Sequence, residues 1–81
     1  MTGRQAVIKF CAHYLSKRNL PPTLTNIDNA LFAIADVFPG DSVENAYLER
    51  LSAFAQTRLY RDINQAARDA LASESNDDDA T

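Results

Sequence analysis

The sequence predicts an all-α protein, a compact bundle of three to four helices followed by a disordered acidic C-terminal tail. Two observations predict the helices. Apolar residues recur at steps of three and four along most of the chain, and no segment alternates apolar and polar residues as a strand would. With 81 residues, the chain holds one domain at most. The expected boundaries are residues 1–73 for the helical domain and 74–81 for the tail.

The first helix is expected from Gly3 to Asn19. Its apolar face has helical spacing and comprises Val7, Ile8, Cys11, Tyr14 and Leu15. The opposite side carries a basic stripe at steps of four residues, formed by Lys9, His13 and Lys17. The two prolines at positions 21 and 22 end the helix, because a residue before a proline is pushed out of helical geometry.

The second helix is expected to begin at Thr23 or Thr25. Thr25 has the side chain of a helix cap, and Asp28 stands where it would complete a capping box. The residues that follow are apolar on nearly all sides of the helix, which is typical of a buried central helix. The proline and glycine at positions 39 and 40 end it.

Asp41 is the expected cap of a third helix, with Glu44 in the capping-box position. No glycine or proline follows, so one long helix to about Ala72 is compatible with the sequence. The apolar stripe slips near Thr57, however. We therefore expect a bend or break within residues 56–61 and a fourth helix from about Tyr60.

Charge is distributed unevenly. The formal net charge is −3, and the four acidic residues of the last stretch account for it. This stretch is polar and has no apolar anchor, so we expect it to be disordered. Residues 1–27 contain no acid, residues 28–49 contain no base, and residues 50–72 contain four arginines against two aspartates. Such asymmetry bears on partners rather than on the fold.

The residues that catalysis and metal binding need are scarce. Cys11 and His13 are the only cysteine and the only histidine, and on a helix their side chains point about 200° apart. We expect a buried Cys11 and a solvated His13. Two glycines cannot build a phosphate-cradling loop. The sequence therefore predicts no enzyme, no metal, no cofactor and no small-molecule substrate.

The chain has no apolar run near the roughly 18 residues of a membrane span. Its beginning does not fit a secretory signal, because charged and polar residues interrupt the apolar ones. A single cysteine forms no internal disulfide, which favours a reducing compartment. These features predict a cytoplasmic protein without a membrane partner.

The stretch TGRQAVIKFCAHYLSKRNLPPTLTNIDNAL resembles the N-terminal helix-turn-helix domain of the LexA repressor family. The matching residues are Thr2, Arg4, Gln5, Ile8, Phe10, Tyr14, Pro21, Pro22, Thr23 and Ile27. Further along, DSVENAYLERLSAF resembles the helix with which that family enters the major groove of DNA. The resemblance implies a regulatory DNA-binding domain. The chain departs from the family in its longer second helix and in having no visible wing.

A nucleic-acid ligand is expected to contact the basic stripe of the first helix and the polar start of the third. The candidate residues are Arg4, Lys9, His13, Lys17, Arg18, Ser42 and Asn45. The carboxylates of Asp41 and Glu44 would repel phosphates, and capping accounts for them without DNA. Three further arginines, at positions 58, 61 and 68, are interleaved with Asp62 and Asp69, so we expect surface ion pairs there.

The competing hypothesis is a protein-interaction module, an inhibitor, adaptor or homodimer. Apolar side chains in excess of what a small core covers are typical of a partner site. The candidate residues are Phe32, Tyr47, Phe54, Leu59 and Ile63. An acidic tail suits a basic partner. Small proteins without catalytic residues are common among phage and mobile-element genes that regulate host machinery. Both kinds of binding remain open, and regulation through DNA ranks first.

Overall fold

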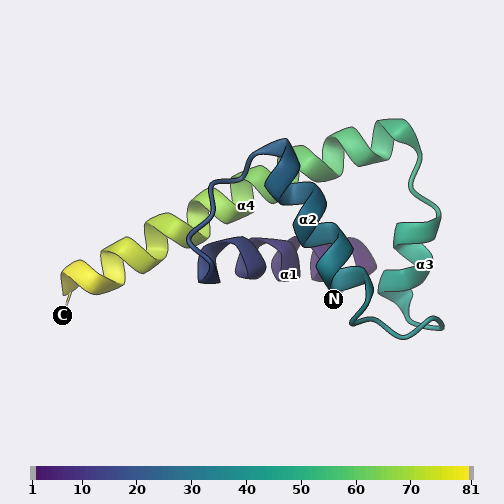
Figure 1. Cartoon of the computed structure of the whole chain (residues 1–81), viewed down its shortest axis with the longest axis horizontal. Helices are drawn as coiled ribbons and strands as arrows, with labels where there is room; N and C mark the ends of the chain where they lie inside the picture. Colours follow the sequence, from purple (N-terminus) through teal and green to yellow (C-terminus); the bar gives the residue numbers. More distant parts are fainter. Residues whose placement is uncertain (1, 81) are drawn as a thin grey trace.

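The computed structural model describes the backbone of residues 2–80 and the side chains of residues 2–73. This part of the chain forms four helices and no strand, which confirms the predicted all-α bundle. The helices are α1 (Gly3–Lys17), α2 (Leu24–Ala35), α3 (Val43–Glu49) and α4 (Ala53–Ala80), as Figure 1 shows. Among them, none is apolar over enough of its length to cross a membrane. The predicted disorder of residues 74–81 falls outside the described side chains and stays a prediction.

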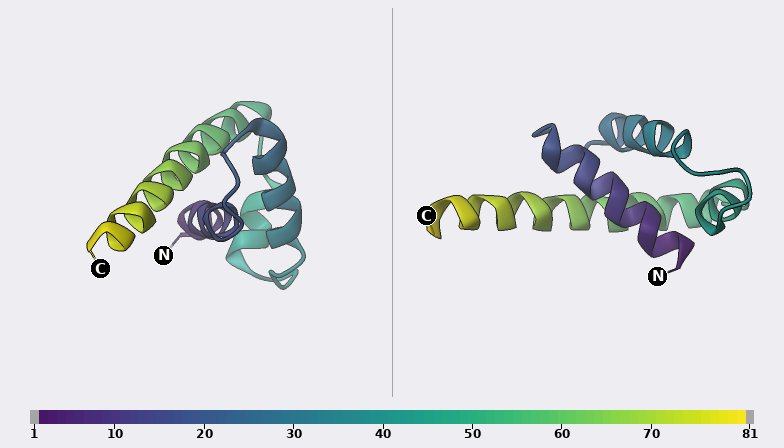
Figure 2. Two further views of the ribbon diagram at one scale, coloured as in Figure 1. Left: turned by 60° about the vertical axis from the view of Figure 1, so that its left-hand side comes forward. Right: turned by 90° about the horizontal axis from the view of Figure 1, so that it is seen from below.

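Helix α1 is the centre of the bundle. It packs against all three other helices, most extensively against α4. Figure 2 (left) shows α1 end-on, with α4 on one side and α2 and α3 on the other. The prediction of a central α2 is therefore wrong. Helix α2 buries only Ile27, Ala30 and Ile34, because its two neighbours cover one side of it, and Phe32 is left 80% exposed.

The core lies where α1, α2 and α4 meet. Its fully or nearly fully buried members are Val7, Cys11, Ala12, Leu15, Ile27, Ala30, Ile34, Leu59, Ile63 and Ala67. Burial raises the pKa of the Cys11 thiol to about 12, which keeps this side chain protonated and apolar in character. The expectation of a buried Cys11 and an exposed His13 is confirmed.

Side chains and backbone turns define both ends of α1. Thr2 and Gln5 form a reciprocal capping box at the start. At the other end, Asn19 takes a left-handed conformation with φ of 55°, and the Leu20 amide donates to the Leu15 carbonyl over 2.9 Å. This pattern closes a helix before the prolines are reached. The helix therefore ends at Lys17 and not at Asn19.

The caps of the next two helices lie one or two residues from the positions expected from the sequence. The Thr23 hydroxyl accepts from the Asn26 amide over 3.2 Å, so Thr23 and not Thr25 caps α2. The Ser42 hydroxyl accepts from the Asn45 amide over 3.1 Å and caps α3. The prediction for Asp41 is wrong, because this residue lies in the turn that precedes the extended cap.

The break between the last two helices lies at residues 50–52 and not at 56–61. Ser52 precedes α4 as its cap, with its hydroxyl accepting from the Ala55 amide over 3.2 Å. Leu51, just before it, is partly buried against the core, so the chain turns where a leucine can point inward. Helix α4 then runs without interruption through Thr57. It buries Leu59, Ile63 and Ala67 at steps of four residues and exposes the opposite side.

Candidate nucleic-acid interface

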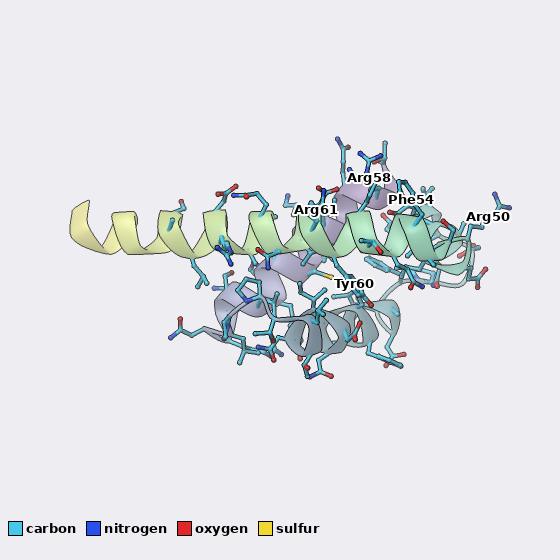
Figure 3. The ribbon with its side chains drawn as sticks, turned by 90° about the horizontal axis from the view of Figure 1, so that it is seen from above. Arg50, Phe54, Arg58, Tyr60 and Arg61 are labelled. Carbon is cyan, nitrogen blue, oxygen red and sulfur yellow. The ribbon has the colours of Figure 1, made fainter. Side chains whose placement is uncertain are left out.

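The exposed side of α4 carries basic residues and one aromatic residue at helical spacing. We call this surface the arginine face, and it consists of Phe54, Arg58, Arg61, Gln65 and Arg68, all exposed. Steps of four, three, four and three residues place these side chains on one side of the helix, opposite the core. Figure 3 looks onto this side of α4 and shows Phe54, Arg58 and Arg61 along it. From Phe54 to Arg68 the face is about 21 Å long.

Asp62 and Asp69 of α4 do not neutralise the arginine face. Asp62 forms an ion pair with Arg4 of α1. Asp69 accepts a hydrogen bond from the Gln65 amide group over 3.1 Å. Among the side chains described up to Ser73, no carboxylate lies within ion-pairing distance of the arginines of this face. The surface pairs expected from the sequence are therefore not formed, and the three guanidinium groups face solvent.

A groove of about 770 Å³ runs beside the arginine face, between α4 and the start of α2. Its walls include Arg61 and Arg68, and none of its lining residues is acidic among the side chains that the structure describes. The Asn64 amide group donates to the Pro22 carbonyl over 2.9 Å and holds the loop that leads into α2. The two arginines thus border a concave surface between α4 and the start of α2.

Tyr60 closes the groove on the α2 side, and in Figure 3 it points toward α2. Its hydroxyl donates a hydrogen bond to the carboxylate of Asp28. Ionisation of the phenol would break this bond and place two negative charges together. The contact therefore raises the pKa of Tyr60 to about 12, from an ordinary value of 10.0.

The raised pKa of Tyr60 makes the contact with Asp28 measurable in solution. Its contribution to stability is complete below pH 10 and is lost as the pH rises through about 12, because the unfolded chain ionises first. An ultraviolet titration of the three tyrosines should show one phenol with a midpoint near 12. Replacement of Asp28 by Ala should move that midpoint toward 10, and an unchanged midpoint would mean that no such bond exists.

The basic residues predicted on the first helix do not form one continuous surface with the arginine face. Lys9, His13 and Lys17 are exposed in one stripe on α1. Two others are engaged elsewhere: Arg4 pairs with Asp62, and the Arg18 guanidinium carbon lies 3.9 Å from the ring centroid of Tyr14. The helical spacing places Asp62 and Asp69 on α4 between α1 and the arginine face. Two separate basic surfaces result.

The polar residues predicted at the start of the third helix hold the preceding turn. Ser42 caps α3, and the Asn45 amide group donates to the carbonyls of Phe38 and Pro39, each over 2.7 Å. Helix α3 has only 7 residues and carries two glutamates and no base. Helix α3 therefore presents no basic side chain to a phosphate backbone, whereas the arginine face presents three guanidinium groups.

The residues predicted to contact a protein partner divide into two groups. Phe32 is 80% exposed and Phe54 is 75% exposed, whereas Tyr47 is partly buried. Leu59 and Ile63 are fully buried, so the prediction that they contact a partner is wrong. Both residues lie on the side of α4 that packs against α1 and α2.

From the sequence alone, the arginines of α4 are expected to form surface ion pairs, because Asp62 and Asp69 directly follow Arg61 and Arg68 along the chain. The signal that identifies the face is the step of three or four residues that also links Phe54 and Gln65 to the arginines. Asp62 and Asp69 each lie one helical turn after a member of this face, Arg58 and Gln65, so they border the face on its α1 side, where Asp62 pairs with Arg4.

The chain matches no protein-family model, no curated protein and no solved structure.

Proposed function

We propose that this chain is a non-enzymatic regulatory protein that binds nucleic acid through the arginine face of α4. The observation that supports the proposal is the arrangement of Arg58, Arg61 and Arg68. They are exposed on one side of a helix, and no carboxylate among the described side chains pairs with them. An unpaired row of guanidinium groups is the pattern that contact with a phosphate backbone requires.

Each part of the face has a distinct role in this proposal. Guanidinium groups donate two parallel hydrogen bonds to a phosphate, which fixes its orientation. Arg61 and Arg68 stand at the groove beside α2 and would follow the backbone there. Phe54, 75% exposed at the start of the row, offers a ring on which an unpaired base can stack.

The rest of the surface supports one orientation of the bound nucleic acid. Residues 28–49, which form most of α2 and all of α3, contain five acids and no base. A polyanion is repelled from that side and attracted to α4. The resemblance of residues 2–27 to a repressor family favours the same kind of ligand, although the contacting helix in this proposal is α4.

The test is the salt dependence of binding, measured by fluorescence anisotropy with short labelled single-stranded and duplex oligonucleotides. Three phosphate contacts give a logarithmic slope of about −2 to −3, so affinity should fall roughly 15- to 60-fold between 50 and 200 mM salt. Tighter binding of the single strand would assign a stacking role to Phe54. An affinity that does not change with salt, or no binding at 50 mM salt, would refute the proposal.

A further inference from the structure

A second open groove lies on the other side of α4, between α4 and the outer surface of α1. Its volume is about 760 Å³. The floor and walls are mostly apolar or small and include Ile8, Phe10, Ala12, Ala66 and Ala70. Lys9 and His13 stand among the lining residues, none of which is acidic within residues 2–73, and Lys17 continues their stripe one turn further. We call this surface the α1 groove. It suits an apolar side chain flanked by negative charge.

The exposed side of α2 has that chemistry. Asp28, Phe32 and Asp36 follow one another at steps of four residues, so one aromatic side chain stands between two carboxylates. The Asp28 carboxylate accepts the Tyr60 hydroxyl through Oδ1, and a carboxylate can accept further hydrogen bonds besides that one. All three are exposed, Phe32 to 80%. The whole segment from residue 19 to residue 49 contains no base. A large apolar side chain with this exposure is typical of a contact surface.

We propose that the chain associates with itself head to tail, with the exposed side of α2 of one copy docked in the α1 groove of the next. The spacings match. Lys9 to Lys17 and Asp28 to Asp36 each span eight residues, or about 12 Å of helix. With the two helices antiparallel, Lys9 faces Asp36, Lys17 faces Asp28, and Phe32 comes opposite His13 at the groove.

The position of the two surfaces dictates the kind of assembly. Phe32 lies on the side of α2 that faces away from α1 and α4, whereas the α1 groove lies across α1 from α2. Such a contact is between unlike surfaces, so each copy retains one free groove and one free α2 side. The wild-type chain is therefore expected to form dimers and then longer assemblies as its concentration rises. The pairing uses no residue of the arginine face and is independent of the proposed function.

Two variants separate this contact from any other form of association. Phe32→Lys disables the α2 side, and Lys9→Glu with Lys17→Glu disables the groove. All three positions are exposed, so the fold should be retained, which far-ultraviolet circular dichroism can verify. Each variant alone should lose self-association at least about tenfold, because an aromatic anchor or both charge pairs are removed.

The decisive experiment is sedimentation equilibrium in low salt at millimolar concentration, free of nucleic acid. Wild-type chain should show a mass that rises with concentration above its monomer mass of 9.0 kDa. Each variant alone should stay close to the monomer mass. An equimolar mixture of the two should form a one-to-one dimer and stop there, because only one intact surface of each kind remains. A wild-type chain that stays monomeric, or a mixture that does not pair, overturns the proposal, and a monomeric wild type leaves the groove to a different acidic partner.

Discussion

Reversal of two charges on the arginine face, Arg61→Glu with Arg68→Glu, is expected to weaken nucleic-acid binding by about two orders of magnitude at 100 mM salt. Each substitution removes a phosphate contact and adds a repulsive charge at the edge of the groove beside α2. Both side chains are exposed and unpaired with any described carboxylate, so the fold should not change. Anisotropy with a short labelled oligonucleotide measures the effect.

The control for this experiment carries the same change in net charge on α1. The probe is an oligonucleotide so short that only one protein chain binds it. For this probe, the affinity of Lys9→Glu with Lys17→Glu should stay within a few-fold of the wild-type affinity. The comparison removes the general effect of a more acidic protein. If the α1 variant lost binding and the α4 variant retained it, the basic stripe of α1 would be the phosphate-binding surface, as the sequence first indicated.

Truncation of Ile63 to Ala is expected to destabilise the protein by about 2–5 kcal/mol. Ile63 is fully buried between the helices, and its shortening leaves a cavity where α1 and α4 meet. A domain of this size has a total stability of roughly 4–12 kcal/mol, so the variant should be partly unfolded at 37 °C. Thermal denaturation followed by circular dichroism gives the comparison.

Phe32→Ala is the matched control for the core substitution. It removes a larger side chain, but one that is 80% exposed, so the change in stability should stay within about 0.5 kcal/mol. Equal losses for the two variants would mean that α2 packs more deeply than described. A loss confined to Ile63→Ala would establish that the two residues, both predicted as partner contacts, belong to different parts of the molecule.

The helices themselves were predictable because their signals are local. Apolar spacing identified the sides of α1 and α4 that carry Leu15 and Ile63, and the prolines after Asn19 marked the first loop. The caps were harder. Thr23 competes with Thr25, and Ser42 with Asp41, and the choice depends on which residue takes an extended backbone when the whole turn closes. That choice depends on the tertiary structure and cannot be predicted from residue type alone.

The arrangement of α2 shows the limit of periodicity. Its apolar residues occur on nearly all sides, which predicts burial, but α3 turns away and α1 takes the central position. Phe32 consequently stays in solvent. The position of the break at residues 50–52 has a similar effect on the site. It makes α4 long enough to carry the row from Phe54 to Arg68, whereas a break at 56–61 would have divided that row between two helices.

In the proposed function, the arginine face of α4 holds the nucleic acid. The most direct measurement is a titration of ¹⁵N-labelled protein with a short oligonucleotide, followed by amide and guanidinium NMR signals. The largest shifts should come from Phe54, Arg58, Arg61, Gln65 and Arg68, with smaller ones at the start of α2 beside the groove. Shifts concentrated on α1 or α3, or a spectrum that does not change at low salt, would contradict the account.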